Sequence, residues 1–406
     1  MITRTIPRTA IPIDSDELKS IFIKASFEDS MSLERNLKAY LGAKAVIALD
    51  SGRSALALAL RLLKLRIGDR VLLPAFVCPV LYDVVASAGF KPFPVDVSYE
   101  NYNIDVSSIK ETNNSKAIIP VHLFGKSYNL TEIKKFADYN GLAVIEDAAQ
   151  ALGLESDHKK IGSFGDLAIL SFGLGKIITG GGGGALVINR DDLVQPAFDA
   201  INEISTVSSS RIKIAANIAA MRFFEKPGFY SIIRSYVNGN LDKTDLKMAE
   251  HVDIAWKSPD AARYVPHKIA PLAAKIADYQ LTKLHDFNER RIHNAKVLSE
   301  ILAYKSEDQV FSQSYFKNNV FCRFPIKLGR NNAKKRDIII RKLLKYGVDS
   351  EKPYFVLRKL PQIIESMPNS SALVDTLITV PNHPCISENE IVSIGETTLS
   401  VLKSEL

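Results

Sequence analysis

The chain has 406 residues, with 52 Lys and Arg against 45 Asp and Glu, which gives a formal charge of +7. A content of 46% hydrophobic and 24% charged residues is that of a globular protein and excludes a disordered chain. The most apolar long window, residues 167–189, contains Lys176 and five consecutive glycines, so it cannot cross a membrane as a helix. The positive charge is too dilute for a nucleic-acid surface, and we predict no nucleic-acid partner.

The three cysteines, Cys78, Cys322 and Cys385, are widely separated and have neither CxxC nor Cys/His ligand spacing. This pattern is typical of a reduced protein and argues against a disulfide framework or a structural zinc site. Residues 1–14 contain no apolar stretch of signal-peptide length. We therefore predict a cytoplasmic protein without a metal site.

Short β-branched apolar runs alternate with amphipathic helical patterns between residues 43 and 189. The predicted strands are residues 45–49, 70–73, 117–121, 143–145, 167–172 and 183–189, and the predicted helices between them include residues 55–65 and 131–139. Apolar runs separated by helices are typical of a mostly parallel sheet covered by helices on both faces. The sequence predicts an α/β fold, with a large domain over residues 1–202.

Residues 203–262 show a different pattern, in which apolar residues recur at helical spacing among Arg211, Lys213 and Arg222. This predicts an inserted segment of two amphipathic helices broken at Pro227. A basic amphipathic pair in residues 205–250 can lie on a membrane surface, but such helices more often pack against the same protein or a second subunit.

Residues 263–406 are predicted to form a smaller α+β domain preceded by a long helix. The expected elements are a helix over residues 271–302, strands within residues 320–326, and helices over residues 334–346 and 388–402.

The most informative segments are two apolar strands that end in polar residues. Residues 143–145 lead into Glu146-Asp147 and then Gln150, and residues 167–172 lead through two glycines to Lys176. Open α/β sheets bind ligands at the carboxyl edge, so Asp147 and Gln150 are expected to face a crevice there. A lysine between apolar and glycine neighbours is partly shielded from water, which suits a nucleophilic amine that forms a Schiff base.

A second candidate element is the start of the helix predicted after residues 45–49. Ser51 can cap this helix, and the N–H groups of Gly52, Arg53 and Ser54 are then available to an anion such as phosphate. A capped helix without a ligand is the alternative. The glycine run at 180–184 is not a P-loop, because Gly175-Lys176 lacks the upstream glycine and is followed by isoleucine.

Five motifs in the same order resemble the DegT/StrS-type sugar aminotransferases, which are pyridoxal-phosphate (PLP) enzymes of the aspartate-aminotransferase fold. The motifs are residues 51–56 (SGRSAL), 120–125 (PVHLFG), 146–150 (EDAAQ), 162–166 (GSFGD) and the pair Ser171-Phe172 three residues before Lys176. The resemblance runs from about Leu33 to the carboxyl terminus.

The resemblance implies a role for individual residues. Lys176 matches the lysine that holds the cofactor covalently and moves protons, and Asp147 matches the carboxylate that pairs with the pyridine nitrogen. Gln150 matches a residue near the ring hydroxyl. Ser171, with the backbone of Gly52, Arg53 and Ser54, matches the phosphate cup.

Three departures from the family pattern affect the cofactor site. The family usually has threonine where Arg53 stands. Cys78 stands where the family usually has an aromatic ring stacked on the cofactor, and Phe76 or Tyr82 could compensate. Pro266 stands where the family generally has an asparagine that reaches the phosphate of the neighbouring subunit.

By resemblance, the chain is expected to be a homodimeric aminotransferase that converts the ketone of a nucleotide-linked sugar into an amine. Glutamate is the expected donor, and the products would enter surface polysaccharides or glycosylated metabolites. Two alternatives remain. A related branch consists of PLP-dependent sugar dehydratases with histidine at the lysine position, so Lys176 counts against it. A non-catalytic regulatory or assembly protein is disfavoured because Lys176, Asp147 and Gln150 are all present.

Overall fold

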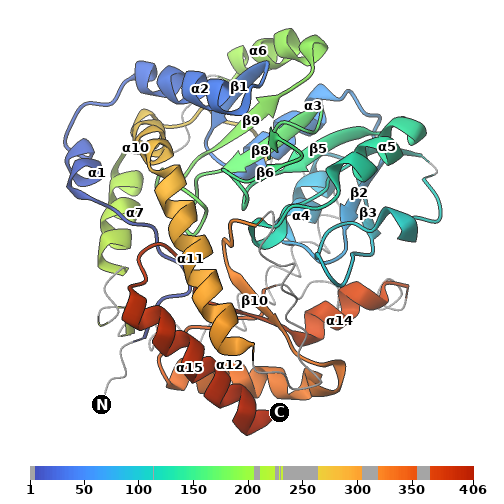
Figure 1. Ribbon diagram of the computed structural model, residues 1–406. Helices are drawn as coiled ribbons and strands as arrows, with labels where there is room; N and C mark the ends of the chain where they lie inside the picture. Colours follow the sequence, from blue (N-terminus) through green and yellow to red (C-terminus); the bar gives the residue numbers. More distant parts are fainter. Residues whose placement is uncertain are drawn as a thin grey trace.

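The fold is built on a seven-stranded sheet in the order β1-β9-β8-β5-β4-β2-β3 (Figure 1). The computed structural model describes residues 5–112, 114–204, 211–224, 228, 230–231, 264–303, 319–353 and 366–406. The strands are β1 (Ala45–Leu49), β2 (Arg70–Pro74), β3 (Lys91–Val95), β4 (Ser115–Ile118), β5 (Ala143–Asp147), β8 (Leu167–Ser171) and β9 (Gly184–Ile188). Only β9 runs antiparallel to its two neighbours, β1 and β8, so the predicted mostly parallel sheet is confirmed.

Alternate residues along the strands enter two different hydrophobic cores. In β1, Val46 and Ala48 belong to one core, while Ile47 and Leu49 belong to the other. The first core also includes buried residues of α2 (Phe27–Leu41), α5 (Leu130–Asn140) and α10 (Pro271–Thr282). The second includes α3 (Gly52–Leu62), α4 (Val80–Ser87), α6 (Val194–Asn202) and α14 (Pro368–Thr376). Helices therefore cover both faces of the sheet, as predicted.

Strand β3 was not predicted, because its sequence KPFPV contains two prolines. Proline cannot donate a backbone hydrogen bond, so within a sheet it is confined to edge strands. β3 is the last strand of the sheet and pairs only with β2. A further small hairpin, β6 (Glu155–Ser156) and β7 (Lys159–Lys160), follows β5.

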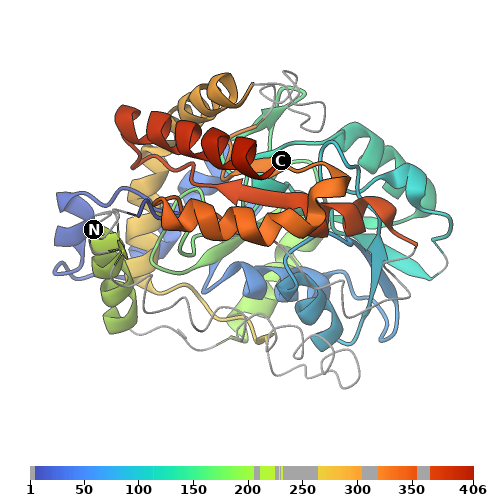
Figure 2. The ribbon, with the colours of Figure 1, turned by 90° about the horizontal axis from the view of Figure 1, so that it is seen from below.

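A third core lies in the carboxyl-terminal part of the chain (Figure 2). It contains the antiparallel pair β10 (Phe324–Lys327) and β11 (Leu377–Val380) with the helices α11 (Leu284–Leu302), α12 (Arg336–Lys345) and α15 (Glu388–Glu405). Near the amino terminus, Ile6 also joins this core and forms a parallel bridge with Val348. The amino-terminal residues therefore pack on the small unit, although the predicted boundaries assign them to the large domain.

The long helix predicted over residues 271–302 is divided into α10 and α11. Lys283 breaks this helix with φ −99° and ψ 0°. Its ammonium donates hydrogen bonds to Asp14, which caps α1 (Ser15–Ser20), and to Glu17 in the first turn of α1. The hydrophobic repeat continues across Lys283, so the sequence pattern does not reveal the break.

The first helix predicted in the inserted segment is present as α7 (Arg211–Phe224). Its buried residues Ile214, Ile218 and Met221 belong to the first core, so this apolar side packs against the same chain. Most of the helix predicted after Pro227 lies outside the described residues. The same is true of most other residues in the range 205–250. Among the described residues, no helix is both long enough and apolar enough to span a membrane.

Candidate active site

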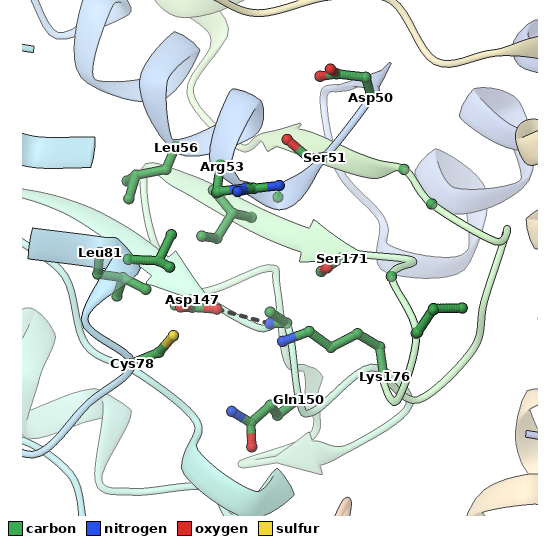
Figure 3. Close-up of a pocket in the computed structure, with 18 of the residues that line it drawn as sticks. Asp50, Ser51, Arg53, Leu56, Cys78, Leu81, Asp147, Gln150, Ser171 and Lys176 are labelled. Carbon is green, nitrogen blue, oxygen red and sulfur yellow. Dashed lines mark hydrogen bonds between the residues drawn. The ribbon is translucent and has the colours of Figure 1, made fainter. Parts of the chain in front are cut away.

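The carboxyl ends of β5 and β8 and the start of α3 surround a cavity of about 510 Å³ (Figure 3). The structure brings six of the seven predicted site residues to its wall. They are Gly52, Arg53, Asp147, Gln150, Ser171 and Lys176. This is the edge at which a parallel sheet presents the loops that follow its strands, as the sequence predicted.

Ser54 is placed differently from the other six. The Ser51 hydroxyl caps α3 by accepting a hydrogen bond from the Ser54 N–H at 3.1 Å, so that N–H is not available to an anion. The Ser54 hydroxyl donates to the Asp50 carboxylate, and Ser54 is absent from the cavity wall. The backbone at Gly52 and Arg53 remains at the wall, where the positive end of the helix dipole favours an anion.

Gly52 allows β8 to approach the start of α3 closely. A Cβ at residue 52 would lie 3.2 Å from the Cβ of Ser171, tighter than ordinary side-chain contact. The Ser171 hydroxyl and the first turn of α3 therefore share one side of the cavity, which forms a compact polar cup.

Asp147 ends β5 and is only 5% exposed. Its Oδ1 accepts a hydrogen bond from the Ala149 N–H at 2.9 Å, and Lys176 extends into the same cavity (Figure 3). Burial raises the pKa of Asp147, although the positive charge of Lys176 works in the opposite direction. A buried carboxylate at a cavity wall is suited to a cationic group of a ligand.

Gln150 lies on the turn after β5, and its Oε1 accepts a hydrogen bond from the Phe124 N–H at 3.0 Å. This contact ties the Gln150 side chain to the motif at residues 120–125. The amide is thereby held at the edge of the cavity.

Glu146 supports the site from behind the wall, a role that the sequence analysis did not assign. Its carboxylate accepts hydrogen bonds from the N–H groups of Gly162, Phe164 and Gly165 and lies 2.9 Å from Nε2 of the buried His122. Burial opposes ionisation, but the bonds from His122 and the backbone outweigh it and lower the pKa of Glu146. The backbone of the GSFGD motif (residues 162–166) therefore surrounds the buried Glu146 carboxylate. The sequence signal for this role is an acidic residue at the end of an apolar strand.

The glycine run after Lys176 permits close packing by several elements. A Cβ at Gly180 would lie 2.5 Å from the Ala273 carbonyl oxygen of α10, and one at Gly184 would lie 2.4 Å from the Gly52 nitrogen. Gly181 has φ +72° and packs against Ile218 of α7. These contacts show that the glycines allow tight backbone geometry beside the site.

The cavity wall contains no aromatic side chain among the described residues. Cys78, at the position where the resemblance places a stacking ring, lines the wall beside aliphatic residues such as Leu81. Phe76 and Tyr82 do not replace the ring, because both are buried in the second core and the Tyr82 hydroxyl donates to the Pro74 carbonyl oxygen. That suggested compensation is wrong.

Helix α7 supplies three wall residues that sequence reasoning did not place there, the polar Lys213 and Asn217 and the apolar Ile214. Asn217 Nδ2 donates to the Gly181 carbonyl oxygen at 2.7 Å, which attaches the helix to the glycine run. Lys213 is exposed at the same wall. Periodicity predicted the helix, but nothing local in the sequence indicated that it lies beside the cavity.

The residues present fit PLP. The cup at Gly52, Arg53 and Ser171 offers hydrogen-bond donors and positive charge to a phosphate, and the buried Asp147 carboxylate offers a partner to a protonated ring nitrogen. Lys176 supplies a primary amine in the same cavity. No aromatic ring of the described residues is available for stacking, so aliphatic side chains and Cys78 would contact the ring face.

Comparisons with known proteins identify the family of the chain. A family model described as the DegT/DnrJ/EryC1/StrS aminotransferase family matches residues 16–215 and 262–398. An uncharacterized protein of Methanocaldococcus jannaschii is 25% identical over 391 residues, which cover 93% of this chain and 91% of that protein. A GDP-perosamine synthase of Caulobacter vibrioides is 38% identical over 165 residues, but these cover only 40% of this chain and 44% of that protein.

The structural comparison supports the fold over the whole chain. PseC of Helicobacter pylori, an aminotransferase involved in the biosynthesis of pseudoaminic acid, aligns with a TM-score of 0.76 at 16% identity. The alignment covers 98% of this chain and 100% of that one. The predicted family is thereby confirmed: the chain belongs to the DegT/DnrJ/EryC1/StrS aminotransferase family, whose enzymes use PLP.

Proposed function

We propose that this protein is a PLP-dependent aminotransferase that converts the ketone of a nucleotide-linked sugar into an amine, with glutamate as donor. The observation that carries the proposal is the meeting of Lys176, Asp147 and the polar cup at Ser171 in one cavity. Products of this kind would serve the synthesis of surface polysaccharides or glycosylated metabolites. The names of relatives such as the GDP-perosamine synthase support the substrate class.

In the proposed reaction, each of these residues has a defined role. The cup at Gly52, Arg53 and Ser171 would hold the phosphate, and Asp147 would keep the ring nitrogen protonated. When bound, PLP supplies a ring that accepts the electron pair left when a proton leaves the carbon beside the amine. Lys176 is the group placed to hold the cofactor and to move that proton. A dehydratase activity is disfavoured because the sugar dehydratases have histidine at the position where this chain has Lys176.

The test is an absorbance spectrum of the purified protein with added PLP, before and after glutamate. A band near the visible edge that shifts with glutamate supports the cofactor and the first half-reaction. A band that glutamate leaves unchanged would reject glutamate as donor. If no band forms, the catalytic proposal fails and a regulatory role becomes the better hypothesis.

The proposal includes a cytoplasmic homodimer. Two exposed apolar side chains offer a contact surface to a second copy of the chain. Phe22 and Ile212 are 86% and 81% exposed and lie on neighbouring segments. The Arg211 guanidinium joins those segments by donating to the carbonyl oxygens of Ile21 and Ile23. Sedimentation equilibrium tests the dimer. A membrane contact through residues 205–250 stays the disfavoured alternative; within this range, the buried side of α7 packs on its own chain.

Cys78→Ala is expected to leave cofactor attachment almost unchanged. Burial raises the pKa of the Cys78 thiol, so it is neutral and unreactive near neutral pH. Cys78→Tyr, by contrast, is expected to lower the Kd for PLP by about two- to tenfold, since a ring pair contributes about 0.5–1.5 kcal/mol. Fluorescence titration with PLP measures both, with Cys385→Ala as control. Loss of binding in the alanine variant would contradict the passive role of Cys78.

Lys213→Ala is expected to raise the KM for the nucleotide-linked sugar by about two- to fivefold and to leave kcat unchanged. An exposed cation at the cavity wall attracts the diphosphate of such a substrate, and a contact of this kind contributes about 0.5–1 kcal/mol. The matched control is Arg222→Ala, which removes an exposed cation from the same helix away from the wall. An equal change in both variants would assign the effect to general charge.

A further inference from the structure

A buried arginine lies directly behind the lysine loop. Arg291 of α11 is 2% exposed, and its guanidinium donates to the Ile177 carbonyl oxygen at 2.8 Å and to Asn288 Oδ1 at 3.0 Å. Within the part of the chain that the structure describes, both acceptors are neutral and Arg291 forms no ion pair. Burial lowers the pKa of Arg291 to about 10. Burying a cation without a carboxylate partner is unfavourable, so the burial of Arg291 at this position requires an explanation.

Asn288 extends the contact to a second loop. Its Nδ2 donates to the Leu152 carbonyl oxygen at 3.0 Å, and the side chain is 5% exposed. The approach depends on Gly153, because a Cβ there would lie 2.3 Å from Asn288 Nδ2. Arg291 and Asn288 thus form a continuous buried bridge between two backbone carbonyls.

The bridged carbonyls belong to the loop that carries Lys176 and to the turn that follows Asp147. Ile177 directly follows Lys176, and Leu152 lies in the turn over residues 149–153 that follows Asp147, the last residue of β5. The lysine loop is also held from the other side, because Gln280 Oε1 accepts a hydrogen bond from the Thr179 N–H at 3.1 Å. Polar side chains of α10 and α11 therefore hold the backbone on both sides of Ile178.

We propose that Arg291 and Asn288 are positioning residues that fix the Lys176 amine relative to the Asp147 carboxylate. The inference rests on the proposed function, in which both groups act on the same cofactor. A misplacement of about 1 Å at a reacting centre can lower a rate about 100-fold, so a rigid link between the loops has a catalytic consequence. Neither residue lines the cavity, and both act through the backbone of their neighbours.

Asn288→Asp is the sharpest variant. The aspartate still accepts the hydrogen bond from Arg291, and its negative charge pairs with the guanidinium, which favours folding. It also replaces the Nδ2 donor to the Leu152 carbonyl with an oxygen, which repels that carbonyl. We expect a Tm equal to or above that of the wild type, together with a tenfold or greater loss in kcat and in the rate of covalent PLP attachment. KM is expected to change little.

A matched pair on α11 provides the control. Arg291→Ala removes the bridge, whereas Arg290→Ala removes the neighbouring exposed arginine, which faces Glu388. Attachment of PLP is expected to slow only in Arg291→Ala, and millimolar guanidinium is expected to restore part of the rate. Should Arg291→Ala fail to fold, Asn288→Asp still decides the question. Variants with the Tm of the wild type and its attachment rate and kcat would overturn the proposal.

A cofactor-free measurement separates this proposal from the proposed function. The positive charge of Lys176 acts to lower the pKa of the Asp147 carboxyl, so the two groups attract one another across the cavity. If Asn288→Asp moves the loops apart, acetylation of Lys176 by acetic anhydride, read by peptide mass spectrometry, is expected to accelerate relative to Lys213. An unchanged ratio would overturn the positioning role. A wild type that never binds PLP would overturn the proposed function, and the acetylation ratio would still report the geometry.

Discussion

The Lys176→Ala variant is expected to lose covalent PLP attachment completely and to lower kcat by about 10³-fold or more. The reason is that the nucleophilic amine and the group that moves the proton are the same side chain, and proton transfer by a positioned group alone contributes about 10²–10⁴-fold. The other basic side chains at the cavity wall, Arg53 and Lys213, lie on α3 and α7 and not on the loop after β8. Neither can take over the position of Lys176.

Borohydride reduction followed by intact mass measurement checks this result. The wild type should gain the mass of one reduced cofactor, with the label on Lys176, and the alanine variant should gain none. Lys176→Arg is the conservative control, since it retains the charge but cannot form the same bond. Lys213→Ala should be labelled like the wild type. A labelled alanine variant, or full transamination by it, would show that the lysine assignment is wrong.

Asp147→Asn is expected to have the second largest effect, a loss of about 10²–10³-fold in kcat/KM. Removing one partner of a buried charge pair costs about 3–5 kcal/mol, and the ring nitrogen would no longer be kept protonated. The hydrogen bond from the Ala149 N–H can persist in the variant, because asparagine also offers an oxygen to it. Steady-state kinetics measure the loss. Activity within threefold of the wild type would contradict the assignment of Asp147.

The same substitution is expected to stabilise the protein when no cofactor is bound. Burial raises the pKa of Asp147 in the folded protein, so the carboxylate weakens the fold as pH rises through that value. Asparagine carries no charge to bury. Asp147→Asn should therefore have a higher Tm than the wild type at neutral pH, with the difference disappearing in acid.

Calorimetry of the cofactor-free proteins across pH measures this difference. The exposed substitution Asp138→Asn is the control and should leave the Tm almost unchanged. A lower Tm for Asp147→Asn at neutral pH would show that the carboxylate contributes a stabilising interaction. A gain in stability combined with a loss of activity is the behaviour of a residue placed for function.

The sequence was most informative where local pattern decides structure. Alternating apolar runs predicted the sheet with helices on both faces, because each strand must bury both of its sides. Motif order predicted the family, and short-range cues placed Asp147, Gln150, Ser171 and Lys176 at strand ends or in the loops that follow them, where parallel strands present their loops. The cap at Ser51 was also predicted, since it involves neighbouring residues.

Other features depended on contacts between distant parts of the chain. The burial of Phe76 and Tyr82 in the second core and the break at Lys283 are each decided by the surrounding packing. Strand β3 is tolerated only because it lies at an edge. Propensity and periodicity describe neighbours in sequence, so they carry no signal for such arrangements.

The sequence by itself therefore determined the family, the α/β architecture and most residues proposed for the cofactor site, because motifs and hydrophobic periods are written in consecutive residues. Only the tertiary structure decided that α7 brings Lys213 to the cavity and that Arg291 and Asn288 connect the loops of Lys176 and Asp147. Arg291 is 114 residues from Ile177 in the chain, and Asn288 is 136 residues from Leu152. Their contacts exist because the packing of helices against the sheet brings distant segments together.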